Sequence, residues 1–232
     1  YLIPSAMAIQ LRVYVPPHPL IQHWLGMARN AESSPKVMRQ TLAELGKWLA
    51  YEAIRDWLPT IDLSLQTPLA EVTATFIHPQ TKLAIVPILR AGLTLVEGIQ
   101  SVLPLESAIY HLGLVRNEET LLPSCYLNKL PDKFDPDTRI IIAEPMLATG
   151  GTIMQAMSEL TQRGIDPGLV RIIAIIAAPP ALQQLSATYP SLSIYAATID
   201  EHVNEVGFIV PGLGDVGDRA FSTGSPGLMG EM

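Results

Sequence analysis

The segment from Arg139 to Thr152 restricts the fold more than any other part of this chain. An apolar, β-branched run ends at a single acid, Glu144, and a loop rich in Thr and Gly separates it from a helical pattern that begins at Ile153. The first backbone N–H groups of a helix lack partners, and the helix dipole favours an anion beside them. A strand, a tight loop and a helix N-terminus in this order therefore predict an α/β protein with a phosphate cradle.

The loop also has the residue types that a phosphate needs. Gly150 and Gly151 have no side chains, so the backbone can close around an anion there. The hydroxyl groups of Thr149 and Thr152 can donate further hydrogen bonds. Glu144 is either an ordinary acid that caps the following helix or a group that contacts a ligand, and the local pattern allows both.

From Lys82 onward, apolar strand-sized runs alternate with helical patterns. The alternation predicts strands at 83–88, 108–115, 139–143, 170–177 and 192–199, and helices at 93–102, 153–163 and 180–187. This is typical of a mostly parallel, twisted sheet with right-handed crossovers and flanking helices. Ligands of such sheets bind beyond the carboxyl ends of the strands, where Arg90, Arg116 and Glu144 fall.

Other parts of the chain add further elements to this core. An N-terminal helix is expected from about Pro19, and Ser34 followed by Pro35 predicts a second helix that runs to about Trp57. Thr-rich alternation at 59–77 predicts a β-hairpin arm, whose base is a candidate subunit contact. The polar stretch at 117–136 is predicted to be a long loop that could act as a lid.

The composition argues against several functional classes. A net charge of −7 and a pI near 5.2 speak against a general nucleic-acid binder, which needs clustered Lys and Arg. No apolar run reaches the roughly 18–20 residues that span a bilayer, so no membrane partner is expected. Cys125 is the only cysteine, which permits no internal disulfide and fits a reducing cytoplasm. The five histidines are scattered, and no GxxxxGK[ST] loop for ATP is present.

Four segments together resemble one enzyme family. They are Pro-Ile-Leu-Arg-Ala-Gly at 87–92, Arg-Asn-Glu-Glu-Thr at 116–120, Pro-Met-Leu-Ala-Thr-Gly-Gly at 145–151 and Ile-Val-Pro-Gly-Leu-Gly-Asp at 209–215. The third resembles the phosphoribosyl-diphosphate (PRPP) motif of type I phosphoribosyltransferases, in the form found in uracil phosphoribosyltransferases. The similarity runs from about His18 to about Phe221. We therefore expect a single domain over 1–232, with 1–6 as additional N-terminal residues and 222–232 as a loose tail.

The resemblance implies the type I phosphoribosyltransferase fold and a glycosyl-transfer reaction. The 5-phosphoribosyl group of PRPP would pass to N1 of uracil and give UMP and diphosphate, a step of pyrimidine salvage. Mg²⁺ is the implied cofactor, bound mainly through PRPP and water rather than by protein metal ligands. A homodimer or homotetramer is implied, and GTP, which activates some members of the family, becomes a candidate effector.

The resemblance also assigns roles to individual residues. Arg90 and Arg116 would hold the diphosphate, Glu144 would hold the ribose hydroxyls, and Asp215 would lie nearest the reacting centre; the catalytic set is Asp215, Arg90 and Arg116. Glu144 stands where the family usually has Asp, and Pro145 replaces a second acid. The PRPP-binding set is Arg90, Arg116, Glu144, Pro145, Met146, Leu147, Ala148, Thr149, Gly150, Gly151, Thr152 and Asp215. The uracil-binding set is Ile209, Gly214, Asp215 and Val216.

Alternatives stand beside this interpretation. The string from Gly212 to Gly217 matches GxGxxG, but only 15 residues follow it, and the absence of an expected helix or second strand there argues against a dinucleotide site. Arg90 could instead form a structural salt bridge. A purine or orotate could replace uracil as the base. The chain could also be a UMP-sensing, RNA-binding regulator, although its charge argues against that, or a binding protein with an inactive site.

Overall fold

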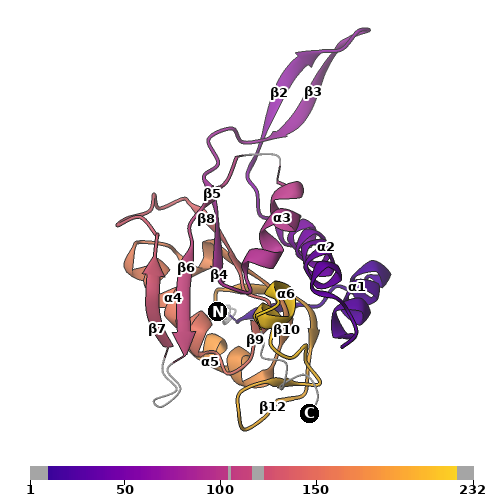
Figure 1. Cartoon of the computed structure of the whole chain (residues 1–232). Coiled ribbons are helices and arrows are strands. Elements are labelled where there is room, and N and C mark those ends of the chain that lie inside the picture. The colour runs from indigo at the N-terminus through magenta and orange to yellow at the C-terminus, as the bar shows by residue number, and fades with distance from the viewer. Residues whose placement is uncertain (1–9, 104–105, 117–122, 224–232) are drawn as a thin grey trace, which may run out of the picture.

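A mostly parallel β-sheet forms the centre of the protein, as the computed structural model shows for residues 10–103, 106–116 and 123–223 (Figure 1). Its strands lie in the order β1-β11-β10-β8-β4-β6-β7, with β5 beside β4 and β9 beside β10. Within the described residues, the pairs of this sheet are parallel except for β6 and β7. The predicted parallel sheet is therefore confirmed. The strands are β1 (Arg12–Tyr14), β4 (Leu83–Leu89), β5 (Ala108–Ile109), β6 (Leu112–Arg116), β7 (Pro123–Asn128), β8 (Arg139–Ala143), β9 (Met146–Leu147), β10 (Val170–Ala177) and β11 (Ser193–Ile199).

Helices cover both faces of the sheet, because successive side chains of a strand point to opposite sides. In β8, Ile141 packs in a core with α1, α2, α3 and α6, whereas Ile140 and Ile142 pack with α4 and α5. All eight residues of β10 are buried, as expected for a parallel strand covered on both faces. None of the helices in the described part of the chain is long and apolar enough to cross a membrane. The helices are α1 (Pro19–Arg29), α2 (Pro35–Ile54), α3 (Leu93–Ser101), α4 (Gly151–Gln162), α5 (Pro179–Thr188) and α6 (Val216–Phe221), with a short 3₁₀ helix at Pro167–Leu169.

Local capping explains where the two N-terminal helices begin. The Ser34 hydroxyl group accepts a hydrogen bond from an N–H group of the first turn of α2, and Pro35 occupies the first helical position, as predicted. At α1 the His18 ring takes the capping role and Pro19 follows it. Proline is tolerated at both places because these N–H groups would have no intrahelical partner.

The predicted hairpin arm is confirmed as β2 (Thr60–Gln66) paired antiparallel with β3 (Glu71–Ile77). The arm extends away from the body of the protein (Figure 1). Apolar side chains on it are exposed, among them Phe76 and, at the tip, Leu69, which is 96% exposed. A hairpin of two strands is only marginally stable by itself in water. The arm thus carries apolar surface that a partner would stabilise by covering it.

The long loop predicted at 117–136 is wrong at 123–128, whereas 129–136 contains no helix or strand, as predicted. Residues 123–128 form β7, an edge strand that pairs with β6. Beyond it, Leu130 and Phe134 are buried in the core, so this stretch is packed against the sheet. A short edge strand needs no continuous apolar run, and its polar residues concealed it. The strand predicted at 108–115 is likewise divided into β5 and β6, and residues 117–122 lie outside the described part.

The expectation that no helix follows the C-terminal glycine string is also wrong. α6 begins directly after Asp215, whose carboxylate accepts the N–H of Asp218 (2.9 Å). Arg39 of α2 donates to the carbonyl oxygen of Ala220, which ties the short helix to the core. A side-chain cap and tertiary packing therefore support a helix that is too short to form alone.

The start of the tail predicted to be loose is held in place. The hydroxyl group of Thr223 accepts a hydrogen bond from Arg90 (2.8 Å) and donates one to Asp218 (2.6 Å). The chain therefore stays attached to the carboxyl edge of the sheet up to this residue. The remaining residues, 224–232, lie outside the described part.

Candidate active site

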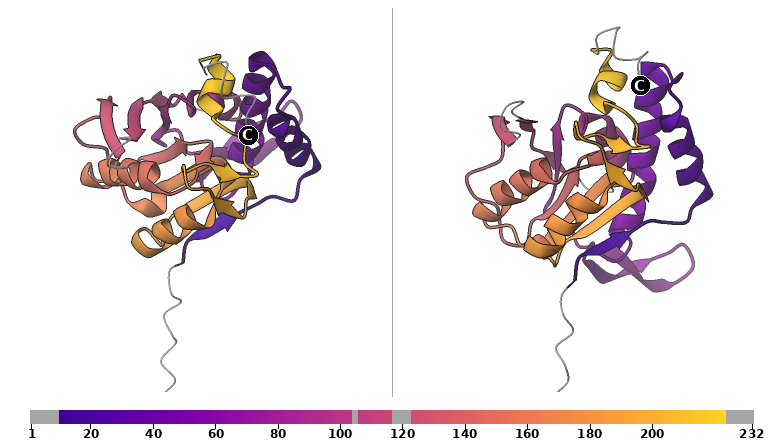
Figure 2. Two further views of the ribbon diagram at one scale, coloured as in Figure 1. Left: turned by 60° about the horizontal axis from the view of Figure 1, so that its bottom comes forward. Right: turned by 90° about the horizontal axis from the view of Figure 1, so that it is seen from below.

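The predicted site residues gather at the carboxyl edge of the parallel sheet. β4 ends just before Arg90, β8 ends just before Glu144, and Asp215 precedes α6. Figure 2 (right) views the molecule from this side, where the segment that leads to α6 (yellow) lies beside the N-terminal helices (indigo). β6 ends at Arg116, whose side chain lies outside the described residues. The contribution of that arginine therefore stays a prediction from the sequence.

The predicted strand, loop and helix form, and the first N–H groups of α4 are available to a ligand. Gly150 precedes the helix with φ +99°, a left-handed conformation that favours glycine. None of the described side chains caps this helix, so its first N–H groups keep their capacity to bind an anion. A cavity of about 60 Å³ lies there. It is lined by Glu144, Met146, Leu147, Ala148, Thr149, Gly150, Thr152 and Ile153.

Contacts with β10 and α5 shape the loop around this cavity. The carbonyl oxygen of Pro145 accepts the N–H groups of Ile175 and Ile176 (2.9 and 3.0 Å). β9 continues this pairing beside the end of β10. A Cβ atom at Gly150 would lie 2.9 Å from the side-chain oxygen of Gln184. Pro145 thus fixes the path of the loop, whereas the residues after it surround the cavity.

Glu144 is buried, with 9% of its surface exposed, and it lines the same cavity. Burial raises the pKa of its carboxyl group to about 8, and a weak hydrogen bond from the N–H of Met146 (3.4 Å) partly opposes this shift. This hydrogen bond joins Glu144 to β9 and not to the N-terminus of α4. The helix-capping interpretation of Glu144 is therefore not supported, and a buried carboxyl that lines a cavity is a candidate functional group.

Arg90 is paired but accessible. Its guanidinium group contacts Asp218 (2.9 Å) and Thr223 (2.8 Å), and about half of the side chain is exposed. The salt-bridge alternative describes this arrangement correctly. An exposed pair of this kind is weak, however, so an anionic ligand can replace the carboxylate. The pKa of Asp218 is lowered by its hydrogen bonds with Thr223 and Arg90, which keeps it charged.

Close packing explains the glycine that follows Arg90. A Cβ atom at Gly92 would lie 2.3 Å from the carbonyl oxygen of Ala143, the last residue of β8. The loop after β4 therefore approaches the end of β8 more closely than a side chain would allow. This contact brings the Arg90 loop next to Glu144. The peptide bond between Leu89 and Arg90 is cis.

A second cavity, of about 310 Å³, joins Arg90 to Asp215 and to the β6–β7 hairpin. The hairpin contributes Tyr126, whose ring packs over Gly113: a Cβ atom at Gly113 would lie 2.6 Å from the ring. Tyr126 is not among the residues predicted from the sequence, because β7 was not predicted. Its position between Cys125 and Leu127 in an alternating strand was the available signal.

The segment predicted to surround uracil forms a tight turn. β12 (His202–Val203) and β13 (Ile209–Val210) pair antiparallel, and Gly212 and Gly214 follow with φ values of +58° and +66°. Ile209 and Val216 are buried in the core, so they present backbone rather than side chains to a ligand. Gly214 and Asp215 are exposed. The turn and the single short helix after it do not build a dinucleotide-binding unit.

Comparison with known proteins gives concordant results. A family model described as uracil phosphoribosyltransferase matches residues 15–223 of this chain. Over 217 residues the chain is 66% identical to the uracil phosphoribosyltransferase of Nostoc sp. (strain PCC 7120), which covers 94% of this chain and 100% of that protein. It is 51% identical to the Nicotiana tabacum uracil phosphoribosyltransferase over 214 residues, 92% of this chain and 95% of that protein. The solved structure of the AQ2163 protein from Aquifex aeolicus aligns with a TM-score of 0.81 and 35% identity, over 91% of this chain and 98% of that one.

Proposed function

The chain belongs to the uracil phosphoribosyltransferase family, and from this membership we propose how the cleft at the carboxyl edge of its sheet performs the reaction. The enzyme transfers the 5-phosphoribosyl group from PRPP to N1 of uracil and releases diphosphate, which makes UMP in pyrimidine salvage. One observation carries the assignment to this cleft. The phosphate cradle, the buried Glu144, the accessible Arg90 and the turn at Gly214 lie on adjacent segments of the same edge.

The cradle at α4 is proposed to hold the 5′-phosphate of PRPP. Its support is the set of unpartnered N–H groups at the helix N-terminus, together with the hydroxyl groups of Thr149 and Thr152 beside them. Glu144 lines the same cavity, so a ribose attached to this phosphate would place its hydroxyl groups near the carboxyl. The carboxylate form accepts hydrogen bonds from such hydroxyls most strongly.

Arg90 and Arg116 are proposed to stabilise the departing diphosphate. Breaking the bond at C1 of the ribose creates an oxocarbenium-like centre, while negative charge grows on the leaving group, so positive charge lowers the barrier. The guanidinium of Arg90 offers forked donors that suit phosphate oxygens. This group contacts Asp218, so diphosphate would take the place of that carboxylate.

Mg²⁺ is the proposed cofactor. The residues of the site fit an ion that binds mainly through the substrate and water rather than through protein ligands. No group of three or more His, Cys, Asp or Glu side chains within the described residues is arranged to hold a metal ion. Mg²⁺ commonly keeps several waters and binds through substrate phosphates with few carboxylates, which matches a site that offers few acids, among them Glu144 and Asp215. When bound, the ion would neutralise charge on the diphosphate.

The turn around Gly214 is proposed to bind the base through its backbone. Uracil offers one N–H donor at N3 and two carbonyl acceptors, which backbone C=O and N–H groups can match where no side chain intervenes. Cytosine places its donors and acceptors differently, and a mismatched buried polar group costs about 1–3 kcal/mol. Asp215 lies in the cavity that Arg90 lines, and either it holds water around the cation or it helps N1 of uracil lose its proton.

Kinetics of Asp215→Asn test this assignment. Asn also caps helices, so α6 should remain folded. Asp166 provides a matched control, because its carboxylate caps the 3₁₀ helix through Gly168 (2.8 Å) just as Asp215 caps α6. We expect kcat for UMP formation to fall by about 10² or more in Asp215→Asn and to be unchanged in Asp166→Asn. A kcat within threefold of wild type in both variants would refute the role of Asp215.

A homodimer or homotetramer is proposed from the β2–β3 arm. Its support is an arm of two strands that extends from the body and exposes Leu69, Val72 and Phe76. Sedimentation of the wild type and of a Phe76→Asp variant tests this proposal. A monomeric wild type, or an unchanged assembly in the variant, would contradict a contact through the arm. GTP is proposed as an effector only on the resemblance to the family, and adding it to the same assay is the test.

A further inference from the structure

The turn proposed to bind uracil is anchored by a buried ion pair. Arg29, the last residue of α1, and Asp200, the residue after β11, form two hydrogen bonds of 2.9 and 2.6 Å. Asp200 is 5% exposed, and most of Arg29 is covered. A forked pair of this kind fixes the relative geometry of the elements that carry it as well as balancing charge. Here the pair joins the end of α1 to the carboxyl end of β11.

The same pair holds both backbone groups of one glycine in the turn. The N–H of Gly212 donates to Asp200 Oδ2 (2.8 Å), and its C=O accepts from Arg29 Nη1 (3.0 Å). Gly212 has φ +58°, and a Cβ atom there would lie only 2.0 Å from the carbonyl oxygen of Ile209. The path of the turn therefore requires a glycine, a carboxylate and a guanidinium group together.

A second arginine holds the next residue of the turn. Arg219 of α6 donates to the carbonyl oxygens of Leu213 (2.7 Å), Ala28 (2.9 Å) and Asn30 (2.7 Å). The end of α1, the turn and α6 are thus joined by side chain-to-backbone hydrogen bonds. Gly214 lies between Leu213, which Arg219 holds, and Asp215, which caps α6. The direction of the Gly214 backbone therefore depends on both neighbours.

Asp200 keeps its charge in this environment. Burial alone would raise the pKa of its carboxyl, but hydrogen bonds from Arg29 and from the N–H of Gly212, with the charge of Arg29, outweigh burial and lower the pKa below its ordinary value. The anchor is therefore intact at neutral pH. Removing either partner would leave a buried charge or a buried N–H group without its counterpart.

We propose that Arg29 and Asp200 are positioning residues that set the affinity of this enzyme for its base. The inference rests on the proposed role of the turn at Gly214 in binding uracil. The pair acts through Gly212 and does not need to touch the base. Recognition by backbone groups depends on their direction, because a hydrogen bond prefers an angle above about 150° and weakens steeply below about 120°. A turn released from the anchor would sample other directions and bind uracil less often in the productive one.

The effect should be specific to the base. The residues around the 5′-phosphate cavity belong to the segment from β8 to α4, which is fixed by hydrogen bonds to β10. Arg90 is held by Asp218 and Thr223 rather than by this pair. Loss of the anchor should therefore raise KM for uracil while it leaves KM for PRPP nearly unchanged.

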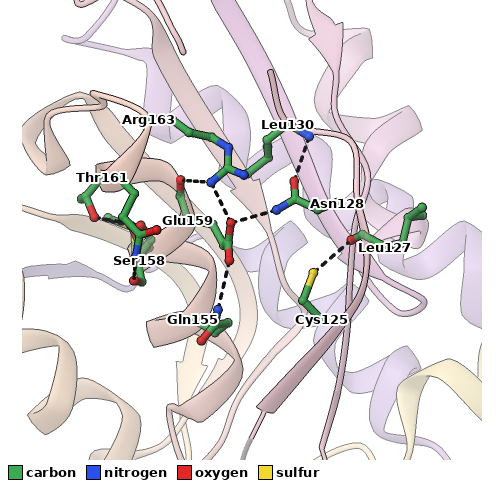
Figure 3. Close-up of polar contacts among 11 residues, drawn as sticks. Cys125, Leu127, Asn128, Leu130, Gln155, Ser158, Glu159, Thr161 and Arg163 are labelled. Carbon is green, nitrogen blue, oxygen red and sulfur yellow. Dashed lines mark hydrogen bonds and ion pairs between the residues drawn. The ribbon is translucent and has the colours of Figure 1, made fainter. Parts of the chain in front are cut away.

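The test compares Arg29→Met and Asp200→Asn with a control at another ion pair. Arg163 is a suitable match, because it is mostly covered and bonds the Glu159 carboxylate (2.7 Å) and carbonyl oxygen (2.8 Å) at the far end of α4 from the cradle (Figure 3). We expect KM for uracil to rise about tenfold or more in the first two variants, with KM for PRPP within about threefold. Arg163→Met should change neither constant. Arg29→Lys keeps the positive charge and a donor group, so it should recover part of the affinity for uracil.

Two further measurements separate the possible failures. Thermal unfolding of every variant shows whether the protein is folded at the assay temperature. Equal rises in both KM values, or a rise shared by Arg163→Met, would reflect a general loss of structure and would overturn the proposal.

Gly214→Ala places a side chain at φ +66° and should raise KM for uracil if the turn binds the base. If it does so while Arg29→Met and Asp200→Asn do not, positioning by the pair is refuted and the base site stands. If none of the three raises it, the proposed base site is itself wrong.

Discussion

Replacing Glu144 with Gln should abolish a pH dependence of PRPP binding that burial of this carboxyl group creates. Burial raises the pKa of this carboxyl group to about 8. At pH 7, one unit below that value, only about 10% of the molecules carry the carboxylate, whereas at pH 9 about 90% do. If the ribose hydroxyls bind the carboxylate form, the apparent affinity at pH 7 is reduced by this fraction, which is close to tenfold.

The assay is kcat/KM for PRPP, measured between about pH 6 and pH 9.5 for wild type, Glu144→Gln and Glu144→Asp. Ionisation of PRPP and of uracil affects all three proteins equally, so the ratio of wild type to Glu144→Gln isolates the contribution of the carboxyl. We expect this ratio to rise close to tenfold from pH 7 to pH 9 and then to level off. Glu144→Asp, which restores the residue usual in the family, should keep a rising profile. A ratio that is constant with pH would refute the reasoning.

Three further predictions concern stability and Arg90. The pKa of Glu144 is about 8 in the folded state and 4.5 ordinarily, so the folded state binds more protons than the unfolded state between these pH values. The free energy of unfolding of the wild type should therefore fall as pH rises through this window. The denaturant midpoint of Glu144→Gln should not show this fall. Midpoints that fall with pH by the same amount in wild type and in the variant would contradict the prediction. Asp218→Asn frees Arg90 from an exposed ion pair worth under about 1 kcal/mol, so KM for PRPP should drop by up to about fivefold. An increase in this KM would contradict the idea that Asp218 competes with PRPP for Arg90. Gly92→Ala brings a Cβ atom within 2.3 Å of the Ala143 carbonyl and should cost about 2 kcal/mol or more in chemical unfolding, whereas an unchanged midpoint would contradict close packing there.

The buried strands and their neighbouring helices could be predicted from the sequence. The strands expected at 139–143 and 170–177 coincide with β8 and β10. They were visible because a parallel strand that is buried on both faces is a continuous apolar run, bounded by turn residues. The loop before α4 could be predicted for a related reason, since its glycines and threonines closely follow such a run. The segments that resemble the family's motifs then pointed to the same edge of the sheet.

The remainder depended on contacts between distant segments. β7 is an edge strand with polar residues, and α6 is a short helix supported by a cap and by α2, so neither has a periodic signature of its own. Arg29 and Asp200 are 171 residues apart, and nothing near either residue predicts their ion pair. The pairing of Arg90 with Asp218 and the position of Tyr126 beside it likewise follow only from the folded structure.

Product analysis of a competition reaction tests the central claim most directly. The wild-type enzyme would be given PRPP and Mg²⁺ with equal concentrations of uracil, cytosine, hypoxanthine and orotate, and the nucleotides formed would be separated and quantified. We expect UMP to be formed with release of one diphosphate per UMP, and the other three bases to yield no comparable product. Formation of a nucleotide from another base at a similar rate, or no nucleotide from any base by a folded enzyme, would contradict it.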